Sequence, residues 1–104
     1  DAIKKYTTLF SGSATATYKN FDVAGLTSKT PEVGSLAVWR LGNGWQGHIG
    51  VVAEIVDKDV FKTIEGNTND VGGREGYIVT RKTRFTNKPY SAKSLNLIGF
   101  IKPL

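Results

Sequence analysis

The 104-residue sequence predicts an α+β fold in which N-terminal helices pack on an antiparallel sheet of about five strands. Apolar residues recur at helical spacing before residue 22, and β-branched residues gather in short runs after residue 34. Helices followed by a run of strands are typical of α+β domains. The length allows one domain, spanning residues 1–104, and no repeat or linker divides it.

Two helices are predicted at the N-terminus. Over residues 1–10 the apolar positions follow helical spacing: Ile3, Tyr6, Leu9 and Phe10. The sequence Ser11-Gly12-Ser13 ends this helix and caps a second one over residues 14–21. From residue 22 to residue 34 the chain holds a proline and two glycines, so we expect a loop there.

Five strands are predicted after Gly34. They cover residues 36–39, 49–56, 60–64, 76–84 and 95–101. The polar triplet Asp57-Lys58-Asp59 separates two apolar runs, which indicates a β-hairpin. A glycine-rich loop is expected over residues 66–73, between the third and fourth strands.

Composition narrows the possible chemistry. The sequence has no cysteine and one histidine, which excludes disulfides, thiolate zinc sites and multi-histidine metal sites within these residues. We therefore expect no cofactor. No apolar run approaches the roughly 18 residues that a membrane-spanning helix needs. The formal net charge of +5 favours polyanionic partners such as nucleic acid or an anionic cell-wall polymer.

The candidate catalytic residues lie at one end of the predicted hairpin. His48 precedes the strand at 49–56, and Glu65 and Asn67 follow the strand at 60–64. Antiparallel pairing would bring His48 within a rung or two of the other two. A carboxylate or amide beside an imidazole sets its tautomer and supports its charged form. The alternative from spacing alone is a hairpin end with a turn-forming Asn67 and a solvated Glu65.

Four further residues are candidates for substrate binding: Trp39, Trp45, Gln46 and Arg74. Trp45 and Gln46 come directly before the histidine segment. The two tryptophans are able to line a groove, although tryptophans in small domains are more often part of the core. For Arg74, in the glycine-rich loop, a ligand contact and a solvated turn both stay open.

Three motifs follow one another along the chain. They are Pro31-Glu32-Val33-Gly34-Ser35-Leu36-Ala37-Val38-Trp39, Gly47-His48-Ile49-Gly50-Val51-Val52 and Ile64-Glu65-Gly66-Asn67-Thr68-Asn69. Together they resemble the motifs of CHAP domains, the cysteine, histidine-dependent amidohydrolases/peptidases. The resemblance covers residues 31–104, about the C-terminal two-thirds of such a domain, and it implies a papain-like, NlpC-like fold.

The resemblance also implies a function. CHAP domains are bacterial or phage peptidoglycan hydrolases that cleave cell-wall amide bonds as amidases or endopeptidases. His48 would be the general base, and Glu65 and Asn67 would orient it. The family's cysteine lies upstream of the histidine motif at the start of a helix, and this sequence lacks it. We therefore expect the chain to be truncated at its N-terminus and inert alone. A periplasmic, secreted or phage-associated location is implied, and the compartment is otherwise unknown.

Other functions stay open. The chain is alternatively a non-catalytic relative that binds peptidoglycan, or one whose nucleophile comes from another chain. A nucleic-acid binder is the weakest alternative, because the sequence has no RNP-like, helix-turn-helix or zinc-knuckle signature. We also predict self-association, since a truncated first helix would leave apolar surface exposed.

Overall fold

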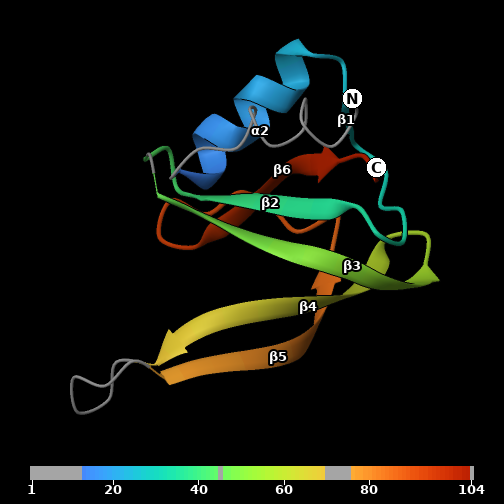
Figure 1. The fold of residues 1–104 in the computed structure, drawn as a ribbon, viewed down its shortest axis with the longest axis vertical. Helices are drawn as coiled ribbons and strands as arrows, with labels where there is room; N and C mark the ends of the chain where they lie inside the picture. The colour runs from blue at the N-terminus through green and yellow to red at the C-terminus, as the bar shows by residue number, and fades with distance from the viewer. Residues whose placement is uncertain (1–12, 45, 70–75, 104) are drawn as a thin grey trace.

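The computed structural model describes residues 13–44, 46–69 and 76–103. Within these ranges one helix precedes six strands (Figure 1). They are α2 (Ala14–Val23), β1 (Thr27–Ser28), β2 (Leu36–Leu41), β3 (Gly47–Asp57), β4 (Val60–Asn69), β5 (Gly76–Phe85) and β6 (Leu95–Ile101). The helix predicted over residues 1–10 lies outside the described residues. Of the helical residues described, none form a segment long and apolar enough to span a membrane.

The six strands form one antiparallel sheet in the order β1-β6-β2-β3-β4-β5. The last strand, β6, lies between β1 and β2, so Ile101 pairs with both Thr27 and Leu36. The predicted hairpin at Asp57-Lys58-Asp59 is confirmed, because Asp57 pairs with Val60 where β3 turns into β4.

The predicted fold class is wrong. The described chain is a sheet-dominated fold with a single short helix, not a set of helices packed on a sheet of about five strands. Most strands extend beyond their predicted ends, and β4 continues through Gly66 to Asn69, where a loop was expected. The described residues form one strand more than predicted, and this additional strand, β1, lies in the predicted loop at 22–34. It holds only two residues, too few to show a period of two in the sequence.

The predicted helix at residues 14–21 is confirmed and continues to Val23. It begins at Ser13, whose backbone is extended and whose Oγ accepts a hydrogen bond of 3.3 Å from the N–H of Ala16. Tyr18 and Phe21, one turn apart, are buried against one face of the sheet. There they form a core with Val38 of β2 and Ile101 of β6. In Figure 1, α2 lies along β2 and β6, on the side away from the β4–β5 hairpin.

A second core lies on the opposite face of the sheet. Ala37 and Trp39 flank Val38 along β2, so their side chains point to the other face. They pack with Val52 of β3, Phe61 of β4 and Phe100 of β6. The two cores therefore share β2 but lie on opposite sides of it.

Strong curvature of the sheet makes the second core possible. Three strand spacings separate β6 from β4, which in a flat sheet is about 14 Å. The ring centroids of Phe61 and Phe100 are nevertheless 5.3 Å apart, in an edge-to-face contact. Pairing of β3 with β4 shifts register twice, between Val52 and Glu54 and between Ile55 and Asp57. Such bulges bend and twist a strand pair, so β4 and β5 curl over the concave face.

Phe61 should be the most sensitive position of this curved face. It is fully buried, and its ring contacts both Trp39 and Phe100. We expect Phe61→Ala to lower the free energy of unfolding by about 3–5 kcal/mol, measured by urea denaturation. The control is Phe85→Ala, since the Phe85 residue is 49% exposed. Equal losses in the two variants would contradict a core that depends on the curvature.

Candidate active site

Five side chains from four neighbouring strands meet on the concave face of the sheet. Trp39 comes from β2, His48 from β3, Thr63 and Glu65 from β4, and Arg84 from β5. Phe61, Thr63 and Glu65 alternate along β4 and therefore share a face. The same face of β4 thus carries the aromatic core at Phe61 and polar groups at Thr63 and Glu65.

The carboxylate of Glu65 is the centre of this cluster. Its side chain is fully buried. Oε1 accepts hydrogen bonds from His48 Nε2 and Arg84 Nη2, both at 2.6 Å. Oε2 accepts one from Arg84 Nε at 2.8 Å and another from the hydroxyl of Thr63. Each oxygen therefore has two partners, and Arg84 binds the carboxylate with both ends of its guanidinium.

These contacts determine the charge of Glu65. Burial alone would raise its pKa, because a buried carboxylate loses its hydration. The hydrogen bonds from Arg84, Thr63 and His48, together with the charge of Arg84, outweigh burial and lower the pKa from 4.5 to about 2. Glu65 is consequently ionised at neutral pH, paired with the guanidinium of Arg84.

The ionised carboxylate in turn selects the tautomer of His48. A carboxylate accepts hydrogen bonds and has no proton to donate. The 2.6 Å contact therefore requires that Nε2 of His48 carry the hydrogen. In the neutral imidazole, Nδ1 is then the basic nitrogen. The side chain of His48 is 20% exposed, so a reacting group is able to reach the ring from solvent.

Trp39 connects the ion pair to the aromatic core. Its ring centroid lies 5.7 Å from that of His48. The guanidinium carbon of Arg84 lies 4.7 Å from the ring centroid of Trp39, which is a cation–π contact. Trp39 therefore limits the movement of both groups that bind Oε1 of Glu65.

Gly50 allows Glu65 to reach His48. A methyl group on Gly50 would lie 2.6 Å from Cγ of Glu65, closer than two carbons can approach. The side chain of Glu65 thus crosses β3 directly over a residue that has none. His48, two residues earlier on the same face of β3, stands at the end of that side chain.

The structure brings together some of the sequence-predicted residues and leaves others apart. His48 and Glu65 are in direct contact, as the hairpin predicted, and Trp39 lies beside them. Gln46 is exposed in the turn before β3, where its carbonyl accepts the N–H of Leu41 at 2.8 Å. Trp45 and Arg74 lie outside the described residues. The backbone of Asn67 pairs with that of Ile78, and its side chain lies outside what the structure describes.

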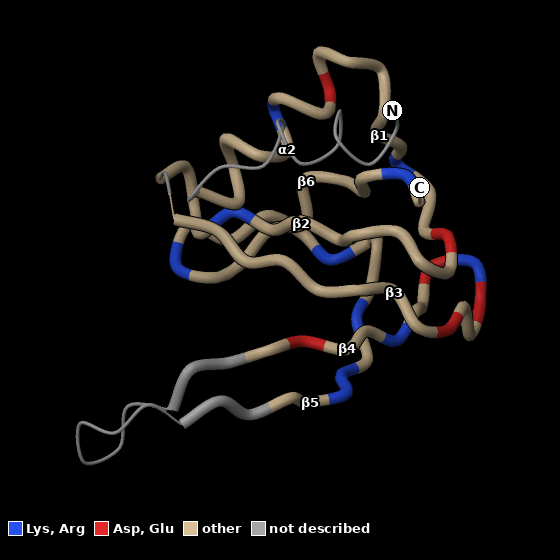
Figure 2. The backbone as a smooth tube through the Cα atoms, in the orientation of Figure 1, with Lys and Arg blue, Asp and Glu red and all other residues tan. Residues whose placement is uncertain are grey.

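Sequence reasoning missed three residues of the site. Thr63 had a usable signal, since it lies two residues before Glu65 and so on the same face of the strand. Arg84 belongs to a basic group of β5, formed by Arg81, Lys82 and Arg84, which Figure 2 shows beside β4. The single acidic residue of β4 is Glu65. A carboxylate placed inside a sheet needs a cation, and this group was the nearest along the next strand. Gly50 had no signal beyond its position two residues after His48.

The described part of the chain contains no cluster of side chains that could bind a metal ion. Within residues 13–44, 46–69 and 76–103, no three His, Asp or Glu side chains gather closely enough to hold an ion. The His48–Glu65 pair suits proton transfer, because an imidazole is able to accept and release a proton and the carboxylate beside it is ionised at neutral pH.

The pKa of Glu65 predicts an acid-dependent loss of stability. Because the folded pKa of about 2 is below the unfolded value of 4.5, the stabilisation is present above pH 4.5 and disappears as the pH falls to 2. The shift corresponds to about 3 kcal/mol in the free energy of unfolding. Urea unfolding from neutral pH down to pH 2 measures it.

Two variants isolate the contribution of Glu65. Glu65→Gln should lose this pH dependence, whereas Glu54→Gln, which alters an exposed ion pair with Arg81, should keep it. Arg84→Lys retains a charge but not the two-pronged contact, so the loss should begin at higher pH. An unchanged acid profile in both Glu65→Gln and Arg84→Lys would contradict the assignment.

Gly50→Ala should separate Glu65 from His48. The added methyl group would displace a side chain that is held by four hydrogen bonds, at a cost of about 1–3 kcal/mol in stability. The chain has one histidine, so its ring ¹⁵N signals report on this site alone. They should show hydrogen on Nε2 in the unmodified chain and a mixture of tautomers in Gly50→Ala. The control is Gly44→Ala, where the nearest atom would be 3.4 Å away. Unaltered ring signals in Gly50→Ala would refute the steric argument.

The sequence was compared with protein families, curated proteins and solved structures. The CHAP domain family model matches residues 4–67, more than half of the chain. The matched segment starts earlier than the motifs at 31–104 that resemble the family, and it ends at Asn67, just after the His48 and Glu65 motifs. No match to a curated protein or to a solved structure was found. The chain therefore belongs to the CHAP domain family, a family of the peptidoglycan hydrolase type.

Proposed function

We propose that this chain is the histidine-bearing part of a peptidoglycan hydrolase, in which His48 acts as general base and general acid. The supporting observation is the 2.6 Å hydrogen bond between Nε2 of His48 and the buried carboxylate of Glu65. Among the described residues, nothing forms a hydrogen bond with the other ring nitrogen, Nδ1. A base oriented by an anion in this way is the arrangement that activates a nucleophile in amide hydrolysis.

The proposed reaction starts at Nδ1 of His48. This nitrogen takes the proton of a cysteine thiol, and the thiolate forms a bond to the carbonyl carbon of a cell-wall amide. The C–N bond then breaks, and the leaving amine takes the proton back from Nδ1. Water then forms a bond to the thioester carbon while Nδ1 takes one of its protons. The C–S bond breaks, a carboxylic acid is released, and the thiolate takes the proton back from Nδ1. The amide is either the bond between muramic acid and L-alanine or a bond within the peptide cross-bridge.

The nucleophile has to come from outside these residues. The sequence contains no cysteine, and neither Ser11 nor Ser13 stands in the motif context of the family's nucleophile. Ser13 is moreover used as the cap of α2. We assign the thiolate to a cysteine that precedes residue 1 in a longer protein, at the start of the helix whose pattern occupies residues 1–10.

Other residues have supporting roles in this proposal. Glu65 orients His48 and stabilises the imidazolium after it takes a proton. Asn67 orients the same ring. Trp39, Trp45, Gln46 and Arg74 contact the substrate. The proposal rests on Trp39 for its ring contact with His48, and on the other three for their sequence positions.

The test compares this chain with a longer protein that carries the cysteine. Both are incubated with purified peptidoglycan, and the amines released are counted. The 104-residue chain should release none, and the longer protein should release them steadily. His48→Ala in the longer protein should reduce the rate at least 1,000-fold, within the range found when a member of a catalytic triad is removed.

A matched control makes the outcome interpretable. Lys19→Ala, in the exposed part of α2, should leave the rate of the longer protein unchanged. Cleavage by the 104-residue chain alone would contradict the need for an added cysteine. Cleavage undiminished by His48→Ala would remove His48 from the reaction.

Binding without cleavage is the second candidate function. The absence of cysteine and the net charge of +5 favour it, because cell-wall polymers carry negative charge. In that case the 104-residue chain should sediment with peptidoglycan, and less so as salt is added. A chain that stays in the supernatant at low salt would exclude this function.

A further inference from the structure

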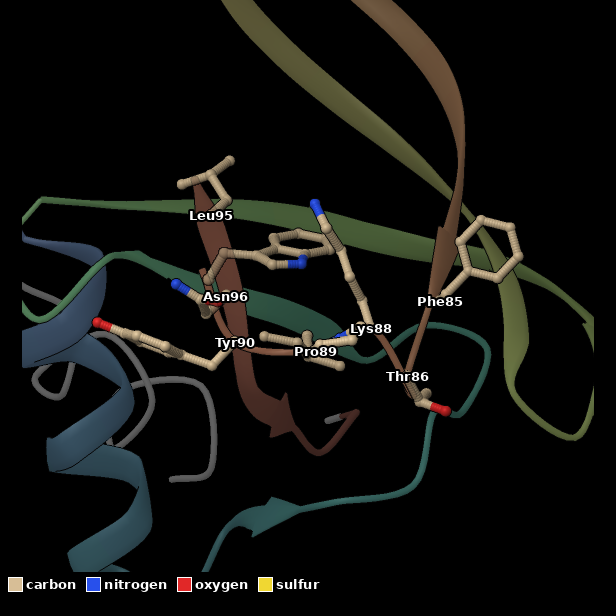
Figure 3. Close-up of a pocket in the computed structure, with 9 residues that line it drawn as sticks. Phe85, Thr86, Lys88, Pro89, Tyr90, Leu95 and Asn96 are labelled. Atoms are coloured by element: carbon tan, nitrogen blue, oxygen red, sulfur yellow. The ribbon is translucent and has the colours of Figure 1, made fainter. Parts of the chain in front are cut away.

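A groove lies beside Trp39, between β5, β6 and the segment that joins these two strands. Two adjoining hollows of about 170 Å³ and 290 Å³ share Trp39, Phe85, Lys88 and Leu95 in their walls. The smaller also contacts Pro89 and Tyr90, and the larger contacts Arg84. In Figure 3 the side chain of Lys88 stands between Leu95 and Phe85, with its nitrogen at the free end. We call these two hollows the Lys88 groove.

The volume of each hollow limits the size of the group that it can hold. An apolar protein cavity of about 150 Å³ accepts one benzene. The smaller hollow, at about 170 Å³, is therefore large enough for one amino-acid residue, and the adjoining hollow of about 290 Å³ leaves room for the next part of a peptide. The walls are partly aromatic and accessible, since Phe85 is 49% exposed and Tyr90 is 58% exposed. Such walls suit the aliphatic part of a small residue.

The charge of the groove is positive. Lys88 makes no hydrogen bond or ion pair within the described residues, so its ammonium is available to a ligand. Of the described residues that line the groove, none is acidic. The nearby carboxylate of Asp59 accepts the hydroxyl of Thr86 at 2.9 Å, and that of Glu65 is bound by Arg84. A ligand with its own carboxylate would thus supply the missing partner of Lys88.

The side of the groove formed by the segment between β5 and β6 is held in shape. Asn96 accepts the N–H of Ser91 at 2.7 Å and donates to the carbonyls of Ser91 and Ser94 at 2.8 and 3.0 Å. Each of these hydrogen bonds would have to break before the loop could move away from Asn96. Asn96 itself borders the groove, so the wall next to Tyr90 is formed before any ligand arrives.

The groove also shares a wall with the catalytic candidates. Trp39 lines it, and the ring centroids of Trp39 and His48 are 5.7 Å apart. A ligand in the groove would thus contact the indole ring that neighbours His48. A substrate whose reacting bond lies at His48 could therefore place its neighbouring residue in the groove.

From these observations we infer that the Lys88 groove binds a carboxylate-bearing residue of a peptide arm of peptidoglycan. Lys88 contacts the carboxylate, and Trp39, Tyr90 and Leu95 contact the aliphatic portion. This inference rests on the proposed function, because it takes the substrate to be a cell-wall peptide. It adds a specific anchor point and a chemical requirement, a free carboxylate, that the family match does not supply.

The test measures binding and not activity. A ¹⁵N-labelled 104-residue chain is titrated with a synthetic stem peptide of peptidoglycan whose carboxylates are free, and with the same peptide whose carboxylates are all amidated. The free peptide should shift the backbone signals of Phe85, Lys88, Tyr90 and Leu95 and saturate. The amidated peptide should bind about tenfold more weakly, as expected for the loss of one charge-assisted hydrogen bond.

Two variants with the same change of charge locate the contact. Lys88→Ala should weaken binding of the free peptide about tenfold and leave binding of the amidated peptide unchanged. Lys19→Ala, on the helix side of the sheet, should leave both unchanged. Equal binding of the two peptides would overturn the inference. Backbone signals that shift only outside the groove would also overturn it. The same holds if Lys88→Ala and Lys19→Ala weaken binding of the free peptide equally.

The outcome is separable from that of the proposed function. If the cysteine-containing protein cleaves peptidoglycan with a requirement for His48 but the free peptide does not bind the groove, only the groove assignment fails. If the free peptide binds in a Lys88-dependent way and no cleavage depends on His48, the catalytic proposal fails and the groove assignment stands as a wall-binding site.

Discussion

The buried carboxylate of Glu65 is the interaction on which the rest of the concave face depends. Moving a carboxylate out of water costs many kcal/mol unless the protein replaces its hydration. Here the replacement comes from β3, β4 and β5, through His48, Thr63 and Arg84. Because the donors belong to three strands, the buried carboxylate has all its hydrogen bonds only when all three strands are paired in register. The charge therefore links strand pairing to the geometry of the histidine.

This dependence extends beyond the part of the chain that matches the family. The family match ends at Asn67, whereas Arg84 lies in β5. The segment with the His48 and Glu65 motifs thus supplies the histidine and the carboxylate bound to it, and the next strand supplies the counter-ion. Without Arg84, the carboxylate would lose its strongest partner and burial would raise its pKa. β5 is accordingly part of the site, not only an added edge strand.

The sequence predicted the His48–Glu65 contact because that contact depends on one local feature. A polar triplet between two apolar runs gives a hairpin, and antiparallel pairing then sets which residues meet. The place of Arg84 depends instead on pairing across residues 70–75, where composition indicates a loop but no register. The fold class failed for a related reason. The lengths of the strands and the two-residue β1 are determined by pairing with distant segments, which local patterns do not record.

The curvature of the sheet was the least predictable feature of the fold. It determines which side chains surround the His48–Glu65 pair. Register shifts near Val52 and Ile55 bend β4 over β2 and β6, so Phe61 reaches Phe100. The same bend puts Arg84 over the ring of Trp39. No residue type marks such shifts, since a bulge inserts an unpaired residue of almost any kind. Hydrophobic alternation still identifies which side chains share a face, but not that two distant strands close over it.

The low pKa of Glu65 also limits how protons can move in any reaction at this site. With a pKa of about 2, Glu65 is ionised at neutral pH and is a much weaker base than an imidazole, so it does not take a proton from His48 there. Its effect is electrostatic and orientational: it keeps hydrogen on Nε2 and favours the charged ring after Nδ1 has accepted a proton. Arg84 moderates that effect, since its guanidinium shares Oε1 with His48. Any proton transfer by the neutral ring is thereby confined to Nδ1, the nitrogen that does not face Glu65.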